Sequence, residues 1–139
     1  MRQHSLEFVV ATRGKGLVDF TREVVAWVRQ CEIRTGLLTL HIRHTSASLV
    51  IQENADPDVQ ADLERFFARL VPDGDPIFRH TSEGPDDMPS HVRAALTATT
   101  LSVPVIDGVP ALGTWQGICV YEHRGQGSRR HVAAHLLGE

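Results

Sequence analysis

The sequence contains 8 histidines in 139 residues, a high count for a side chain that transfers protons and binds metal ions near neutral pH. Three stretches place histidines among hydroxyl, carboxylate or guanidinium groups, and they are the candidates for a functional site. Enrichment alone does not define a site, because several of these histidines are expected to be ordinary surface residues.

The first stretch runs from His44 to Ser48 and reads HTSAS, between two predicted strands. It offers an imidazole and several hydroxyls at a strand end. The alternative is a tight β-connection whose hydroxyls bond the local backbone, which the composition alone favours. Asn54 follows shortly before the helix start at Asp56-Pro57. A helix amino terminus favours anions, so Asn54 is a candidate anion-binding residue, with an ordinary cap as the alternative.

The second stretch runs from His80 to His91 and reads HTSEGPDDMPSH. Its two histidines and the carboxylates of Glu83, Asp86 and Asp87 fall on one loop and the first turn of the next helix. Neutral imidazole and carboxylate oxygen are ligands of divalent metals. Neighbouring carboxylates also stabilise an imidazolium, which suits general acid–base catalysis. The alternative is a solvated acidic loop, and the residues alone leave this open.

The third stretch covers residues 113–124 and reads GTWQGICVYEHR. Glu122 and Arg124 are expected on one face of its strand, so that one strand end carries both charge signs. Arg124, Arg129 and Arg130 offer bidentate contacts to a phosphate. For Arg129 and Arg130 we prefer a solvated hairpin tip between the last two strands.

The elements that position these stretches follow from hydrophobic periodicity and turn residues. Strands are predicted at 6–12, 37–43, 47–52, 101–106, 114–123 and 131–137, and helices at 17–30, 56–70 and 86–97, with a long loop at 72–85. Asp56 is the expected cap of the second helix. The predicted buried side of that helix consists of Val59, Leu63, Phe66, Phe67 and Leu70. Short connections between consecutive strands favour an α+β fold, a mostly antiparallel or mixed β-sheet sandwich with packed helices.

Composition sets limits on function. The length suits a single domain spanning 1–139. A net charge of −3 gives no reason to expect nucleic-acid binding. Cys31 and Cys119 form no CxxC pair, the first residues lack the apolar core of a signal peptide, and no apolar run is long enough to cross a bilayer. We therefore expect a cytoplasmic protein that contacts no membrane. Serine-elbow, Walker, HExxH and dinucleotide-binding motifs do not occur.

Three segments together resemble the YjbQ-like family: HTSASLVIQENADPDVQADL (44–63), EGPDDMPSHV (83–92) and LGTWQGICVYEHR (112–124). The likeness extends over most of the chain from Gly36 onward. Asn54 and Asp58 fit the family's ENxDPDV element, whereas Gln52 stands where the family more often has Asn.

The resemblance implies a homotrimer whose polar pocket is lined by the motif histidines, and a weak thiamine-phosphate synthase-like activity on phosphorylated small molecules. That activity joins a pyrimidine diphosphate to a thiazole phosphate with loss of diphosphate. The candidate catalytic residues are His44, His80, His91 and Glu122. The candidate substrate- or anion-binding residues are Thr45, Ser46, Asn54 and Arg124. The candidate ligands of a divalent metal, Zn or Mg, are His44, His80 and His91. The alternative function is a non-catalytic trimeric module that binds an anionic metabolite or a metal.

Overall fold

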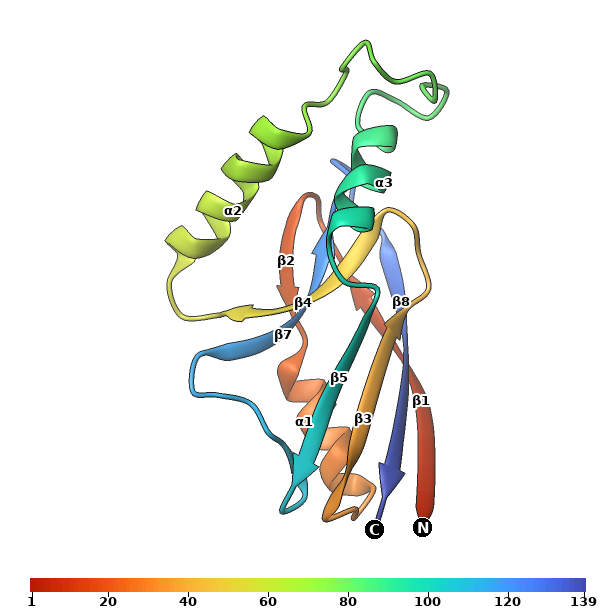
Figure 1. Cartoon of the computed structure of the whole chain (residues 1–139), viewed down its shortest axis with the longest axis vertical. Helices are drawn as coiled ribbons and strands as arrows, with labels where there is room; N and C mark the ends of the chain where they lie inside the picture. The colour runs from red at the N-terminus through yellow and green to blue at the C-terminus, as the bar shows by residue number, and fades with distance from the viewer.

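A computed structural model describes all residues, 1–139, and contains two antiparallel sheets and three helices (Figure 1). The five-stranded sheet has the order β1-β8-β3-β5-β6 and the three-stranded sheet the order β2-β7-β4. The elements are β1 (Arg2–Ala11), β2 (Gly16–Asp19), α1 (Thr21–Gln30), β3 (Thr35–Ile42), β4 (Ala47–Glu53), α2 (Pro57–Leu70), α3 (Asp87–Leu96), β5 (Thr100–Ile106), β6 (Val109–Pro110), β7 (Gln116–Glu122) and β8 (Arg129–Gly138). The α+β class and the antiparallel sheets are as predicted.

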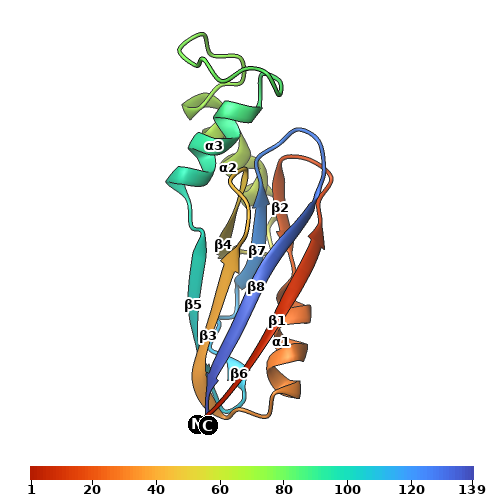
Figure 2. The same cartoon turned by 90° about the vertical axis from the view of Figure 1, so that its right-hand side faces the viewer.

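The hydrophobic core lies between the large sheet, the small sheet and α1. Strand β3 shows the predicted alternation, with Leu38 and Leu40 fully buried and Thr39 and His41 on the other face. Val24 and Val28 of α1 are also fully buried in this core. Figure 2 shows α1 at the end of the molecule near the chain termini and α2 and α3 at the opposite end. The core therefore fixes the sheets, and α2 and α3 extend beyond it.

The first helix begins later than the sequence predicts. Helix α1 begins at Thr21, and residues 16–19 form β2, in which Leu17 and Val18 pair with β7. The apolar residues recur at helical spacing only from Phe20 onward. Leu17 and Val18, which precede it, are part of a strand because they pair with β7. Asp19, two residues before the helix start, accepts a hydrogen bond from the Thr21 N–H through Oδ1 at 2.8 Å.

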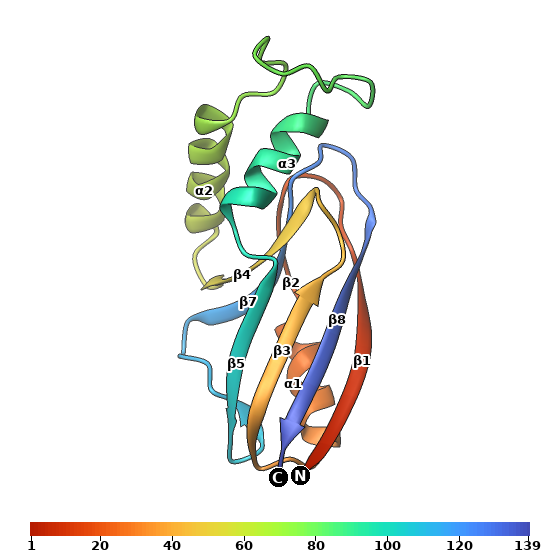
Figure 3. The ribbon, with the colours of Figure 1, turned by 45° about the vertical axis from the view of Figure 1, so that its right-hand side comes forward.

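The predicted hairpin between the last two strands is also wrong. Strand β7 pairs with β2 and β4, and β8 pairs with β1 and β3, so the two strands belong to different sheets. Each is already flanked on both sides. The segment 123–128 is consequently a crossover between sheets, which brings the end of β7 close to the start of α3 (Figure 3).

Helix α2 begins as predicted, because Asp56 Oδ1 accepts a hydrogen bond from the Asp58 N–H at 2.9 Å. Its predicted buried side is only partly covered: no residue of α2 is fully buried, and Phe66 and Leu70 are 55% and 54% exposed. Phe67 of that side packs edge-on against Tyr121 of β7, with ring centroids 5.7 Å apart, whereas Phe66 and Leu70 remain mostly exposed. None of the three helices combines the length and the apolar character that a bilayer span requires.

Candidate functional site

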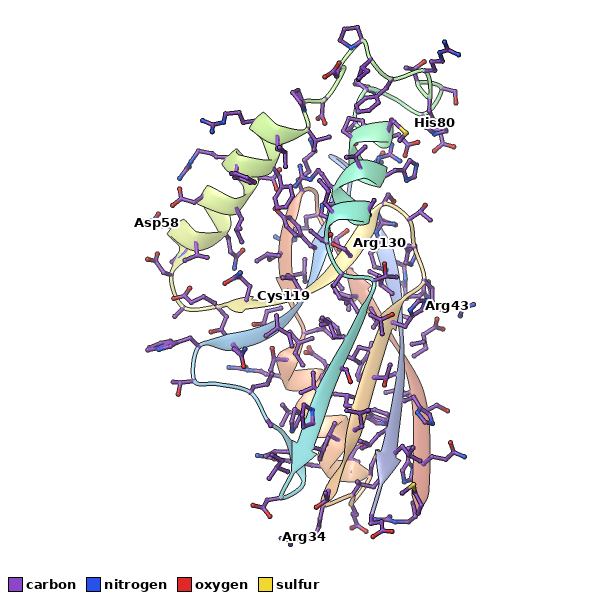
Figure 4. All side chains as sticks on the ribbon, in the orientation of Figure 1. Arg34, Arg43, Asp58, His80, Cys119 and Arg130 are labelled. Atoms are coloured by element: carbon purple, nitrogen blue, oxygen red, sulfur yellow. The ribbon has the colours of Figure 1, made fainter.

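The side chains of His80, Asp87 and His91 converge at the start of α3. His80 comes from the long loop, Asp87 is the first residue of the helix, and His91 lies one turn later on the same face. One ligand atom from each residue lies within 4.8 Å of the other two. His80 Nε2 is 2.7 Å and His91 Nε2 3.3 Å from the same oxygen, Asp87 Oδ2. Figure 4 labels His80 at this end of the molecule.

The carboxylate of this cluster is buried and the imidazoles reach solvent. The Asp87 side chain is 2% exposed, against 49% for His80 and 30% for His91. Burial alone would raise the pKa of Asp87, but the hydrogen bond with His80 and the positive fields of His91 and Arg124 hold it below its usual value. The cluster thus presents a fixed negative charge to two accessible imidazoles.

The tautomer of His91 follows from its second contact. His91 Nδ1 lies 2.8 Å from the carbonyl oxygen of Thr45, which only accepts hydrogen bonds, so Nδ1 carries the proton. In the neutral ring, Nε2 then directs its lone pair at Asp87 Oδ2. That arrangement is favourable only when a cation, either a proton or a metal ion, lies between the two atoms. A histidine that donates its other N–H to a carbonyl is typical of metal ligands.

Arg124 holds the acidic side of the cluster in place. Its Nε donates to Asp86 Oδ2 at 3.0 Å, Nη1 to Asp87 Oδ1 at 2.7 Å and Nη2 to the Glu83 carbonyl at 2.9 Å. Asp86 Oδ2 also accepts from the Gly125 N–H at 2.8 Å. Each guanidinium nitrogen of Arg124 is therefore engaged by its own chain, which leaves little of it for the anion contact predicted from the sequence.

The ligand set fits zinc better than magnesium. Two imidazole nitrogens and one carboxylate oxygen suit zinc and related transition ions, whereas magnesium prefers oxygen ligands throughout. Three protein ligands leave coordination positions for water or a substrate, as catalytic zinc sites do. The exposure of His80 and the partial exposure of His91 keep that side of the cluster open.

His44 lies outside this group of ligand atoms. Its Nε2 accepts a hydrogen bond from the His131 N–H at 2.8 Å, and its Nδ1 lies 3.3 Å from Arg130 Nη1. Burial, followed by the charge of Arg130, lowers the pKa of His44, so the ring is neutral at physiological pH. The structure thus brings together two of the three predicted metal-binding histidines, with Asp87 in the third place.

The backbone of the HTSAS stretch nevertheless contacts the cluster. Thr45 supplies the carbonyl that orients His91. Ser46 Oγ accepts a hydrogen bond from Arg130 Nη2 at 2.9 Å. The side chains of Thr45 and Ser46 were predicted to contact substrate. In the structure, His44 and Ser46 instead hold the backbone on either side of Thr45 in place. This positions the Thr45 carbonyl to accept the hydrogen bond from His91.

Glu122 is a buried partner of Arg130. The two side chains are 0% and 6% exposed, and Arg130 Nε donates to Glu122 Oε1 at 2.9 Å. Thr12 Oγ1 donates to the same oxygen at 2.5 Å. Arg130 is therefore not the solvated hairpin residue that the sequence suggested, because the crossover turns it into the space between the sheets. Glu122, predicted to be catalytic, has no surface that a substrate reaches in this conformation.

Asn54 lies far from the cluster within one chain. It follows the last residue of β4, whose first residue, Ala47, lies within the HTSAS stretch, and the seven residue steps from Ala47 to Asn54 span about 23 Å along a strand. Its Nδ2 donates to Asp19 Oδ2 at 3.4 Å. Asp58, four residues on, is labelled on the opposite side from His80 in Figure 4. The chain by itself does not assemble Asn54 and the histidines into one pocket.

A second polar network joins Ser48 of the first stretch and His123 of the third to Arg93, and it is closed to solvent. Arg93 Nε donates to His123 Nδ1 at 3.2 Å, which leaves His123 Nε2 to donate to Ser48 Oγ at 2.8 Å. Burial, followed by the charge of Arg93, lowers the pKa of His123 to about 3. This serine–histidine pair is therefore unsuited to nucleophilic catalysis, since an arginine and not a carboxylate stands behind the imidazole.

Fold and site together define an α+β protein of two antiparallel sheets with a histidine–aspartate cluster at the start of α3. The sequence matches the family described as UPF0047 protein YjbQ-like over residues 6–139. A UPF0047 protein of Synechocystis sp. is 51% identical over 99% of this chain and 94% of the relative. The UPF0047 protein YjbQ of Escherichia coli O157:H7 is 44% identical over 99% and 98%. The chain belongs to the YjbQ-like UPF0047 family, as the motifs indicated.

Solved structures agree on the fold. A conserved hypothetical protein of Thermus thermophilus is 35% identical with a TM-score of 0.84, covering 95% of this chain and 99% of that chain. A YbjQ-like protein of unknown function from Sulfolobus solfataricus has a TM-score of 0.89 at 24% identity, over 99% of both chains, and shows the fold alone.

Proposed function

We propose that this protein is a metal-dependent enzyme that acts on a phosphorylated small molecule, with His80, Asp87 and His91 as the ligands of a zinc-type ion. The observation that supports this most is the geometry of the cluster: two imidazole nitrogens face one oxygen of a buried carboxylate, all within 4.8 Å. The ion would offset negative charge that builds up on a phosphoryl group or its leaving group.

The residues around the ligands have supporting roles in this proposal. Arg124 occupies Asp87 Oδ1, so that only Oδ2 is offered to the ion. The Thr45 carbonyl keeps the proton of His91 on Nδ1, so that Nε2 is free to bind. We assign His44 to positioning this carbonyl, because its own ring nitrogen Nε2 accepts from the backbone of His131.

The reaction we propose is the one that the family resemblance implies, thiamine-phosphate synthase-like transfer with loss of diphosphate. In such a transfer a bond to a diphosphate oxygen breaks while the carbon it leaves forms a new bond to the acceptor. The open coordination side of the ion suits a diphosphate. Arg124 is already engaged by Glu83, Asp86 and Asp87, so the ion would compensate the negative charge of the diphosphate.

The test compares metal content and turnover in matched variants. Purified wild-type protein, reconstituted with zinc and dialysed, is expected to retain one ion per chain. His80→Ala, His91→Ala and Asp87→Asn are expected to lose both the ion and product formation from a pyrimidine diphosphate and a thiazole phosphate, with the assembly intact. His4→Ala, which changes an exposed histidine on β1, is the control.

Full zinc content and turnover in these three variants would refute the proposal. Zinc binding by the wild type without product over long incubation would instead favour the alternative, a non-catalytic module that binds a metal or an anionic metabolite.

A further inference from the structure

The long loop before α3 encloses a hollow of about 330 Å³. Its walls come from residues 74–89, and one of the wall residues is the candidate ligand His80. Met88 and Pro89, which follow the ligand Asp87 directly, form another wall. The hollow therefore opens beside the metal cluster and shares a residue with it.

The walls of this hollow are largely apolar. Phe78 and Met88 line it together with three prolines, Pro76, Pro85 and Pro89. Asp75 is the only carboxylate, and its Oδ1 already accepts the Ile77 N–H at 2.9 Å. No lysine or arginine lines the hollow, so nothing in it recognises a phosphate.

A second hollow, which shares Pro85 with the first, has the opposite character. It measures about 630 Å³ and is lined by polar and charged residues, among them Lys15, Asp86 and Arg124. Pro85 lines both hollows. The candidate ligand His80 lines the apolar one, and Asp86, the neighbour of the candidate ligand Asp87, lines the charged one. A ligand held by the ion thus has one charged and one apolar neighbourhood.

We propose that the hollow of residues 74–89 is a subsite for an uncharged, ring-sized apolar group of the ligand whose anionic group binds at the His80–Asp87–His91 ion. The inference rests on the proposed metal site. The volume exceeds the roughly 150 Å³ that accommodates a benzene ring in a protein interior. Proline walls lose little conformational freedom on contact, and methionine adapts to the shape of a ring and contacts it favourably through sulfur.

The test uses two phosphonates of equal charge, phenylphosphonate and methylphosphonate, with the zinc-loaded protein. Phenylphosphonate is expected to bind roughly tenfold to a hundredfold more tightly, as burial of a phenyl-sized group predicts. Phe78→Ala and Met88→Gln are expected to bring the two affinities together while zinc content and methylphosphonate binding stay unchanged. Ile77→Ala is the matched control, since Ile77 is 76% exposed and does not line the hollow.

The two methionines provide a direct probe. With isotope-labelled methyl groups, the Met88 resonance is expected to shift with phenylphosphonate and with phenol. Met1, which is 83% exposed, serves as an internal reference and is expected to stay in place. Equal affinities of the two phosphonates, or a Met88 signal that does not move at saturation, would overturn the subsite. A protein that binds no zinc but shifts Met88 with phenol would keep the subsite and reject the metal site.

Discussion

Arg124 and Asp87 meet through one carboxylate oxygen only. Arg124 Nη1 donates to Asp87 Oδ1 at 2.7 Å, while Oδ2 faces the two histidines. The contact therefore fixes both the position and the rotation of the carboxyl group. It joins the end of β7 to the start of α3, two segments that lie 37 residues apart in the sequence.

This contact predicts that Arg124 controls metal affinity without binding the metal. Arg124→Gln is expected to weaken zinc binding by roughly tenfold to a hundredfold, as other changes behind a metal ligand do. The zinc affinity of Arg124→Lys is expected to lie between those of the wild type and Arg124→Gln, because lysine keeps the positive charge but cannot make the several hydrogen bonds of the guanidinium group. Competition with a chelating dye measures the affinity. Arg129→Gln, an exposed arginine at the start of β8, is the control, and equal affinities in all variants would contradict the role.

Glu122 is predicted to serve stability and not catalysis. Glu122→Gln leaves the buried guanidinium of Arg130 without its counter-ion and is expected to lower the free energy of unfolding by about 3–5 kcal/mol. Urea denaturation measures the loss, and zinc content per folded chain is expected to stay unchanged. Replacing both residues by apolar ones, Glu122→Leu with Arg130→Met, should recover much of the loss. A Glu122→Gln protein that is as stable as the wild type but inactive would contradict this prediction and support a catalytic role for Glu122.

His123 is predicted to make the protein less stable in acid. Its pKa is near 3 in the folded protein and near the ordinary 6.5 in the unfolded chain, so the unfolded chain binds the additional proton between these values. Stability from this group is full above pH 6.5 and is lost as the pH falls toward 3, by roughly 1.4 kcal/mol per pH unit.

The measurement is the pH dependence of the free energy of unfolding between about pH 4.5 and 6.5, above the range in which carboxylates titrate. His123→Gln is expected to be less stable than the wild type at neutral pH and to show a flatter slope in this window. His4→Gln should keep the wild-type slope, because His4 is exposed. Parallel slopes for the wild type and His123→Gln would contradict the prediction.

The uncovered side of α2 predicts a subunit contact, in keeping with the expected homotrimer. Phe66→Asp is expected to shift the mass in sedimentation equilibrium from three chains of 15.4 kDa to one, because it places a charge on apolar surface that would be buried. Arg22→Ala, at an exposed position of α1, is the control. A wild-type protein that sediments as a single chain would refute the trimer.

Local features of the sequence determined most of the elements. The alternation of Leu38, Leu40 and Ile42 predicted strand β3, and the Asp56-Pro57 pair predicted the start of α2, because both signals depend on neighbouring residues only. The approach of His80 to His91 was also within reach, since loop and helix start are continuous in sequence. The role of Asp87 was available in principle from its spacing of four residues before His91 on one helical face.

Only the tertiary structure decided which distant groups meet. The separation of β7 and β8 into two sheets buries Arg130 against Glu122 and brings Arg124 to Asp87, and no local pattern contains that pairing. The same packing directs the His44 ring toward the backbone of His131, and the carbonyl of Thr45 then orients His91. Burying a charged side chain costs free energy, and pairing it with an opposite charge offsets that cost. Which charged side chains become buried and paired depends on how the two sheets pack around the core.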